Sequence, residues 1–186
     1  MPFGERNDKL RTFGGITQPD RESASAGREK GATMAETATT YQDLGYDKIF
    51  VSLDGSEQQD KVLDRAIVMA ANDNAELYIG HVIDSTALEA AGTFPVDIVP
   101  SLEKTFRESI DAKVKAAEAN PDIKKVEVLV RAGRIRETIK DEMLDVIEPD
   151  LVICGARGLS SIKYAILGSI STFLTRNTDC DTLIIK

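Results

Sequence analysis

The fold of this chain is best predicted from Lys48-Ile-Phe-Val-Ser-Leu53, a short run that ends at once in Asp54-Gly55-Ser56. Four of its six residues are large and apolar, and they do not alternate with polar residues as they would in a half-exposed strand. An apolar run closed by turn-forming residues predicts a strand that is buried on both faces. Strands of this kind belong to parallel sheets that are covered by helices.

The rest of the chain repeats this pattern. Further apolar runs are expected to be strands at residues 77–83, 126–130, 151–154 and 182–185. Between them, apolar residues recur every three or four positions, which predicts helices over residues 56–72, 102–117, 135–147 and 169–176. Ser56 and Gln59 have the spacing of a capping box, so the first helix is expected to begin at Ser56. Because strands alternate with helices, we predict an α/β sandwich around a five-stranded parallel sheet.

Polar and glycine residues follow three of the predicted strands. Asp54 follows the first strand, Asp84 follows the second, and a loop from Gly155-Ala-Arg-Gly158 to Gly168-Ser169 follows the fourth. In an open parallel sheet, ligands bind beyond the carboxyl ends of the strands. We therefore expect these residues to surround one ligand site, or Asp54 and Asp84 to form a paired-carboxylate or magnesium site.

The glycine loop has the features of an anion site. Gly155 and Gly158 have no Cβ, so their backbone can approach a phosphate closely or adopt a positive φ. Gly168 precedes a predicted helix, whose free N–H groups and dipole favour an anion. Side chains that could add hydroxyl donors or positive charge are Ser169, Ser171, Arg157 and Lys163. An ordinary strand-to-helix turn would explain Gly155 alone, but it does not explain the full spacing of three glycines.

Composition excludes several classes of function. The 186 residues include 23 Lys and Arg against 31 Asp and Glu, which gives a net charge of −8. A sequence-independent nucleic-acid binder needs a basic face instead. No apolar run approaches the roughly 20 residues of a membrane-spanning helix. One histidine and two cysteines leave little for a metal site or a disulfide scaffold. We expect a cytoplasmic protein with no metal centre, no nucleic-acid partner and no membrane partner.

The first 45 residues differ from the rest. Residues 1–33 hold five of the 13 glycines and only four large apolar side chains, too few to offset the entropy of ordering them. We expect residues 1–45 to be a disordered N-terminal extension, or residues 1–33 to be extraneous sequence ahead of a start at Met34. The folded domain is expected over residues 46–186.

Several other residues are expected to be structural. His81, inside a predicted strand, is expected to be packed or hydrogen-bonded rather than catalytic. Cys154 and Cys180 are expected to be reduced, and Asp84 to be a solvated turn residue. We expect two charged stretches, residues 58–61 and 104–115, to lie on the solvent-exposed faces of helices.

From Tyr46 to Lys186 the chain resembles the universal stress protein family, and in particular its ATP-binding branch. The resemblance rests on Gly155-x2-Gly158-x9-Gly168-Ser169, on Ile49-Phe-Val-Ser-Leu-Asp-Gly-Ser56 and on His81-Val-Ile-Asp84. It implies a Rossmann-like three-layer sandwich with strand order 3-2-1-4-5, and a homodimer formed through the C-terminal strand. The family often has Cys-Pro-Val before that strand, whereas this chain has Cys180-Asp181-Thr182, which bears on the details of the pairing.

The resemblance also implies a ligand, ATP with or without Mg²⁺, and a set of binding residues. Asp54 would lie against the nucleoside, the backbone of Val82 would contact adenine, and the glycine loop would wrap the phosphates. The full set carried over is Leu53, Asp54, Val82, Gly155, Arg157, Gly158, Gly168, Ser169, Ile170 and Ser171.

Two functions follow from these patterns, and two others are set aside. The first is an ATP-binding stress-response regulator without catalytic residues, which acts as a homodimer on an unidentified protein partner. The second is a slow ATPase or a self-phosphorylating enzyme that uses Ser169 or Ser171. A phospho-acceptor receiver domain is set aside because Val130-Arg-Ala-Gly133 supplies no acceptor aspartate. A Walker P-loop is excluded because no Gly-Lys-[Ser/Thr] occurs in the chain.

Overall fold

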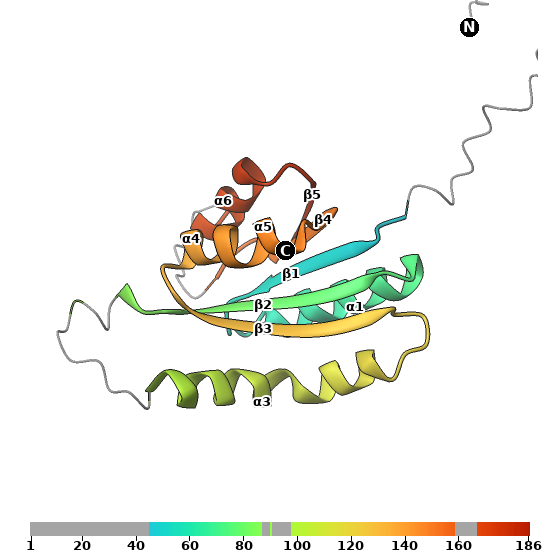
Figure 1. Cartoon of the computed structure of the whole chain (residues 1–186), viewed down its shortest axis with the longest axis horizontal. Coiled ribbons are helices and arrows are strands. Elements are labelled where there is room, and N and C mark those ends of the chain that lie inside the picture. The colour runs from blue at the N-terminus through green and yellow to red at the C-terminus, as the bar shows by residue number, and fades with distance from the viewer. Residues whose placement is uncertain (1–44, 87–89, 91–97, 159–166) are drawn as a thin grey trace, which may run out of the picture. The chain divides into compact units, whose positions relative to one another are not determined.

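The computed structural model describes residues 45–86, 90, 98–158 and 167–186. Within them, five parallel strands form one sheet in the order β3-β2-β1-β4-β5 (Figure 1). The strands are β1 (Lys48–Leu53), β2 (Glu76–Asp84), β3 (Lys125–Gly133), β4 (Leu151–Gly155) and β5 (Asp181–Ile185). This confirms the predicted three-layer fold and its strand order.

The order of the strands reverses beside β1. The chain moves outward in one direction through β2 and β3, and then returns to β4 and β5 on the other side of β1. In register, Ile49 of β1 lies opposite both Leu77 of β2 and Leu151 of β4. The carboxyl ends of β1 and β4 therefore flank a topological switch point, where ligands bind in open α/β sheets.

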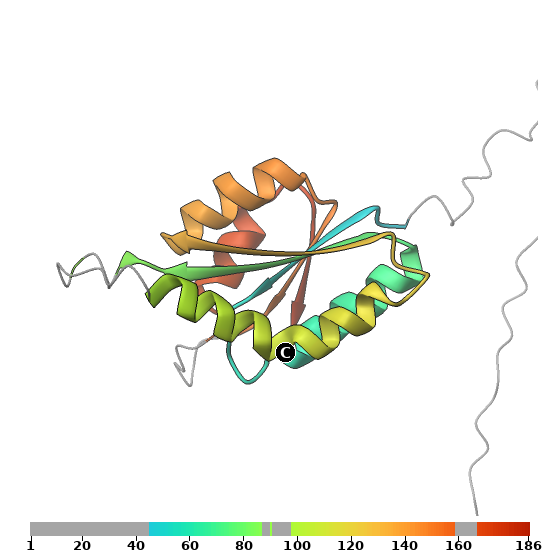
Figure 2. The ribbon, with the colours of Figure 1, turned by 60° about the horizontal axis from the view of Figure 1, so that its bottom comes forward.

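Helices cover both faces of the sheet (Figure 2). The first two are α1 (Gln59–Asp73) and α3 (Ile98–Glu118), which lie together on one face. The opposite face carries α4 (Ile135–Ile139), η2 (Lys140–Leu144), α5 (Asp145–Ile147) and α6 (Ser169–Asn177). This division follows from right-handed crossovers, since the chain travels in opposite directions across the sheet in its two halves.

The core is divided by the sheet into two apolar layers. Alternate residues of a strand point to opposite faces, so Ile49 and Val51 pack toward α1 and α3 while Phe50 packs toward α4 and η2. All three side chains are fully buried. Burial on both faces explains why the strand is apolar throughout.

Three local predictions need correction. Ser56 and Gln59 form no capping box, because α1 begins at Gln59 and the side chain of its N-cap residue, Gln58, makes no capping bond. The helix expected from residue 102 begins at Ile98, so that Pro100 lies in its first turn, where proline is tolerated. The helix expected over residues 135–147 contains a π-helical segment, η2, between α4 and α5.

Candidate functional site

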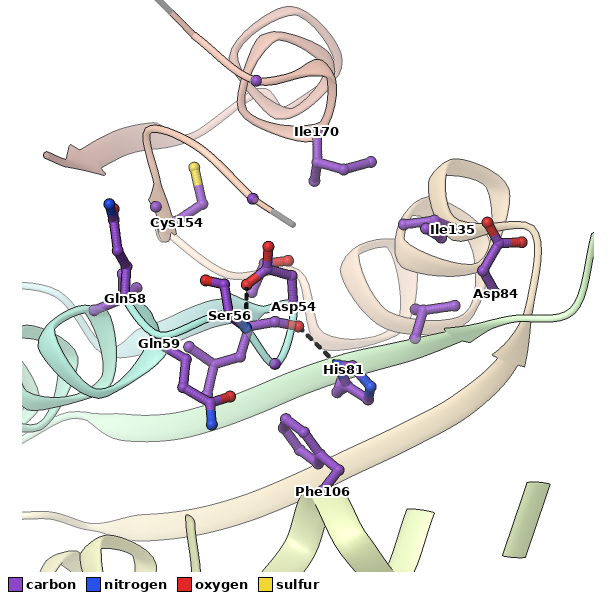
Figure 3. Close-up of a pocket in the computed structure, with 18 of the residues that line it drawn as sticks. Asp54, Ser56, Gln58, Gln59, His81, Asp84, Phe106, Ile135, Cys154 and Ile170 are labelled. Carbon is purple, nitrogen blue, oxygen red and sulfur yellow. Dashed lines mark hydrogen bonds between the residues drawn. The ribbon is translucent and has the colours of Figure 1, made fainter. Parts of the chain in front are cut away.

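A pocket of about 630 Å³ lies over the carboxyl ends of β1, β2 and β4 (Figure 3). It reaches across the edge of the sheet, from Phe106 of α3 on one face to Ile135 of α4 on the other. All ten residues singled out from the sequence line this pocket. They come from the ends of three strands, from the loop after β4 and from the start of α6.

Asp54 and Gly158 pack against each other although they are far apart in the sequence. Asp54 Oδ1 accepts a hydrogen bond from the backbone N–H of Ser56 at 3.0 Å, which fixes the turn after β1. The other carboxylate oxygen, Oδ2, occupies the space that a Cβ at position 158 would need. A side chain at position 158 would therefore have to displace the Asp54 carboxylate or the loop.

The loop after β4 is anchored at both of its described ends. The N–H of Ala156 donates to Ile185 O at 2.7 Å, and the N–H of Gly168 donates to Ala156 O at 2.7 Å. The Ser171 hydroxyl donates to Gly155 O at 2.6 Å, and its side chain is buried. In this arrangement Ser171 holds the loop, so its proton is not directed at a ligand.

Gly155 and Gly158 are closely packed against protein atoms, and neither has an unusual backbone angle. Among the described glycines, only Gly55 has a positive φ, of 80°. A Cβ at Gly155 would lie 3.2 Å from the carbonyl oxygen of Arg157. A Cβ at Gly168 would make only ordinary contacts, the nearest at 3.5 Å. The positive φ expected as one alternative for Gly155 and Gly158 is therefore not observed, and the close approach of their backbone to a phosphate remains a prediction.

The start of α6 directs backbone N–H groups at the pocket. Its N-cap is Gly168, which has no side chain with which to cap the helix, and the first intrahelical bond runs from Thr172 N–H to Gly168 O at 3.0 Å. The N–H groups of Ser169, Ile170 and Ser171 precede that bond, so they have no partner within the helix. Arg157 adds an exposed positive charge on the same wall, while Lys163 lies outside the described residues.

His81 holds the end of β1 in place. Its Nδ1 lies 2.9 Å from Leu53 O, and because a carbonyl only accepts, Nδ1 carries the proton. The ring stacks on Phe106 of α3, with centroids 4.0 Å apart and planes 8° apart. Burial lowers the pKa of His81, against the opposing effects of the Leu53 carbonyl and the Asp54 carboxylate. These contacts agree with the structural role expected from the sequence.

Asp84, which was expected to be a solvated turn residue, is instead the exposed last residue of β2, at the pocket rim. It accepts the backbone N–H of Thr86 at 2.9 Å and the Thr86 hydroxyl at 2.5 Å. These two hydrogen bonds stabilise the carboxylate and lower the pKa of Asp84. Within the described part of the chain, no three His, Cys, Asp or Glu residues gather as they would around a metal ion.

The two cysteines are free thiols in the structure. Cys154 is buried at the end of β4 and lines the pocket, and burial raises the pKa of its thiol. Burial also raises the pKa of the Cys180 thiol. Neither is therefore activated as a nucleophile. None of the helices in the described ranges combines the length and the apolar character of a membrane span.

One wall of the pocket was not anticipated. It consists of the start of α1 and one face of α3, and its residues are Gln58, Gln59, Leu102, Thr105, Phe106 and Ser109. The sequence pattern placed residues 58–61 and 104–115 on solvated helix faces. Helical spacing identifies the apolar side of each helix, but it does not indicate that polar residues of two helices meet over the sheet edge.

The fold and this pocket define an open parallel α/β domain with a glycine-containing loop at its switch point. The family model described as "Universal stress protein family" matches residues 45–186. The chain belongs to that family.

Sequence relatives agree with this assignment, and solved structures share the fold. A Staphylococcus saprophyticus protein named as a universal stress protein is 26% identical over 143 residues, which cover 77% of this chain and 85% of the relative. A similar Staphylococcus aureus protein is 28% identical over 143 residues, covering 77% and 86%. The structure of universal stress protein UspA from Lactobacillus plantarum superposes with a TM-score of 0.62 at 19% identity, covering 76% of this chain and 99% of that one. The universal stress protein from Archaeoglobus fulgidus, solved in complex with dAMP, has a TM-score of 0.50 at 18% identity, covering 76% and 98%.

Proposed function

We propose that this chain binds ATP in the pocket over β1, β2 and β4, and that the nucleotide controls how it associates with itself or with another protein. The observation that carries the proposal is the start of α6. There, the unpaired N–H groups of Ser169, Ile170 and Ser171 and the side chain of Arg157 line a pocket that also contains Asp54. Three backbone donors at a helix start form a site for a phosphate group.

The local charge of the site supports this ligand in an otherwise acidic domain. Residues 46–186 carry 17 basic and 24 acidic side chains, a net charge of −7. Such a domain repels a long polyanion, because nucleic-acid binding depends on neutralising many phosphates. A single triphosphate needs only a local positive field, which the α6 dipole and Arg157 supply.

The size and chemistry of the pocket suit a nucleotide. Its volume of about 630 Å³ falls within the roughly 300–1,000 Å³ of small-molecule sites. Apolar side chains, among them Val82, Ile135 and Ile139, could contact a base. Asp54 could accept hydrogen bonds from ribose hydroxyls. The Archaeoglobus fulgidus protein of this fold was solved with dAMP, so the fold can accommodate an adenine nucleotide.

We assign regulation rather than catalysis to the bound nucleotide. His81 is the only histidine, its pKa is lowered, and its Nδ1 is held by Leu53 O. It is therefore poorly placed to take a proton from water. Bound ATP would instead contact both Asp54 and the loop after β4. That loop is hydrogen-bonded to β5 through Ala156, so the nucleotide could influence a homodimer formed through β5. Mg²⁺ would accompany the triphosphate, and Asp54 and Asp84 are carboxylates that line the pocket.

A weak enzymatic activity is the second candidate. It is favoured by Ser169, whose side chain is exposed at the start of α6 and lines the pocket. This hydroxyl could attack the γ-phosphorus and form a seryl phosphate, with ADP as the leaving group. Ser171 is less suitable, since its hydroxyl is buried and bonded to Gly155 O.

Titration calorimetry with ATP and Mg²⁺ tests the proposal. We expect one site per chain, with binding weakened at least about tenfold by Arg157→Ala together with Asp54→Ala. Absence of binding at millimolar nucleotide would exclude the proposal. Incubation with γ-labelled ATP tests the second candidate, because self-phosphorylation should disappear in Ser169→Ala and persist in Ser101→Ala. Phosphate release without label on the protein would indicate hydrolysis instead.

A further inference from the structure

The outer edge of the sheet at β3 exposes backbone groups that no neighbouring strand can bind. β3 pairs with β2 on one side, and no strand among the described residues pairs with its other side (Figure 1). Gly133 O accepts from Ser85 N–H on the β2 side. Because the backbone groups of alternate residues point to opposite sides of a strand, the carbonyl groups of Val128 and Val130 point outward.

An arginine donates to each of these two outward carbonyl groups. Arg107 Nη1 of α3 lies 3.3 Å from Val128 O. Arg131 Nη1 of β3 lies 3.0 Å from Val130 O. The two side chains come from opposite faces of the sheet, since Arg107 belongs to α3 whereas Arg131 pairs with Glu142 of η2 (Figure 2). The edge is therefore covered from both faces.

Ion pairs orient both arginines. Glu103 Oε1 lies 2.8 Å from Arg107 Nε, one turn away on α3. Glu142 Oε2 lies 3.7 Å from Arg131 Nε. Each arginine thus directs Nε at a carboxylate and Nη1 at a backbone carbonyl. A guanidinium group has five N–H donors in a fixed plane, so it can serve both partners at once.

The sequence of β3 favours pairing with another strand. It is nine residues long and contains Val126-Glu-Val-Leu-Val130, in which three of the five residues are β-branched. A long edge strand with free backbone groups is a template on which another chain can add a strand. An uncovered β3 would therefore be a surface for self-association.

The other edge strand, β5, lacks this cover. Asp181 N–H bonds to Asp150 O on the β4 side, so the backbone groups of Thr182 and Ile184 point outward. Among the described residues, no side chain bonds to these outward groups. The two edges of one sheet are thus treated differently.

We propose that Arg107 and Arg131 close the β3 edge to a second copy of this chain, so that strand pairing between copies is confined to β5. An added strand would need the carbonyl groups of Val128 and Val130 as acceptors, and the guanidinium groups already occupy them. It would also have to displace two charged side chains from their carboxylate partners. This inference is independent of the proposed function, because it involves neither the pocket nor a nucleotide.

Light scattering of the full chain over a range of concentrations tests it. Arg107→Ala together with Arg131→Ala opens both carbonyl groups, so two copies can pair their β3 strands. The mass of this variant should rise with concentration to at least about twice that of the wild type. Arg65→Ala together with Arg136→Ala is the matched control, since it removes the same charge from exposed arginines of α1 and α4. The control should keep the wild-type mass.

Hydrogen exchange identifies the surface through which the variant associates. In the larger assemblies, the outward N–H groups of Val128 and Val130 should exchange more slowly than in the wild type, because an added strand binds them. Circular dichroism establishes that the assembled chain is folded. If the double variant is unfolded, Arg107→Ala and Arg131→Ala are tested singly in the same way.

Three results would overturn the inference. The folded variants could keep the wild-type mass, or the control could assemble as the double variant does. Larger assemblies could also leave the exchange of the Val128 and Val130 N–H groups unchanged, which would place the contact elsewhere.

Discussion

Because Gly158 has no Cβ, the Asp54 carboxylate can pack against the loop after β4. Asp54 Oδ2 lies where that Cβ would be, so Gly158→Ala must displace either the carboxylate or the loop. We expect this variant to bind ATP at least about tenfold more weakly, with little change in unfolding temperature because both groups lie at the pocket rim. Calorimetry and thermal unfolding would measure the two effects.

Gly168→Ala is the matched control for the fold of the loop. Its Cβ would make ordinary contacts of 3.5 Å or more, and the φ of −72° suits any residue. We expect this variant to unfold at the wild-type temperature. Should Gly158→Ala bind ATP as the wild type does, the contact with Asp54 has no part in binding.

His81 should make stability depend on pH. Burial lowers its pKa, so the folded state favours the neutral ring relative to the unfolded chain. Its contribution to stability is therefore present above the ordinary histidine pKa of about 6.5 and is lost as the pH falls through the lower folded value. Between about pH 7 and pH 5, the free energy of unfolding should decrease more in the wild type than in His81→Phe, which keeps a ring against Phe106. Urea unfolding at several pH values measures this, and equal slopes would contradict it.

The residues around the phosphate end of the pocket could be predicted because topology brings them together. In a parallel sheet with a switch point, the segments after β1 and β4 must meet, so Asp54 and Gly155 could be paired without a structure. The wall that contains Gln59 and Ser109 could not be predicted in this way. Its position depends on how two helices pack side by side on one face, and the spacing of apolar residues within each helix does not specify this.

At the scale of single elements, β2 contains a glycine that the packing requires. A Cβ at Gly80 would overlap the ring of Phe50 and would lie 3.0 Å from Met143 Sδ. Phe50 is fully buried, so its ring cannot simply turn out into solvent. We expect Gly80→Ala to lower the free energy of unfolding by about 1–3 kcal/mol, the usual cost of overpacking.

Urea unfolding would measure that loss. Gly45→Ala is the matched control, since its Cβ would approach nothing nearer than Asp73 at 3.7 Å. It should leave stability nearly unchanged. A Gly80→Ala chain as stable as Gly45→Ala would mean that the sheet and η2 can separate at no cost.

The elements themselves could be predicted more reliably than their ends. The strand β1 was evident because burial on both faces requires an unbroken apolar run. The start of α1 could not be predicted in this way. Asp54 Oδ1 accepts a hydrogen bond from the Ser56 N–H, which forms a turn, and the helix begins only at Gln59. Likewise, helical periodicity gives no sign of the π-helical segment η2, in which Met143 and Leu144 are buried.

At the scale of the whole molecule, the β5 edge of the sheet is the surface through which we propose homodimerisation. β5 pairs with β4 on one side, and no strand among the described residues pairs with its other side. Asp181 N–H bonds to Asp150 O, and Ile185 O accepts from Ala156 N–H. Because alternate residues point to opposite sides, the N–H groups of Thr182 and Ile184 face away from β4. A second chain could pair with them.

Two substitutions at Ile184 separate strand pairing from packing. Ile184→Pro removes an outward N–H while leaving the bonds to β4, since proline is tolerated on edge strands. Ile184→Ala loses similar packing against the core but keeps the N–H. By light scattering at micromolar concentration, the wild type and Ile184→Ala should be dimers. Ile184→Pro should dissociate with a constant raised about tenfold or more. A wild-type monomer would exclude the homodimer, whereas a dimeric Ile184→Pro chain would move the interface away from β5.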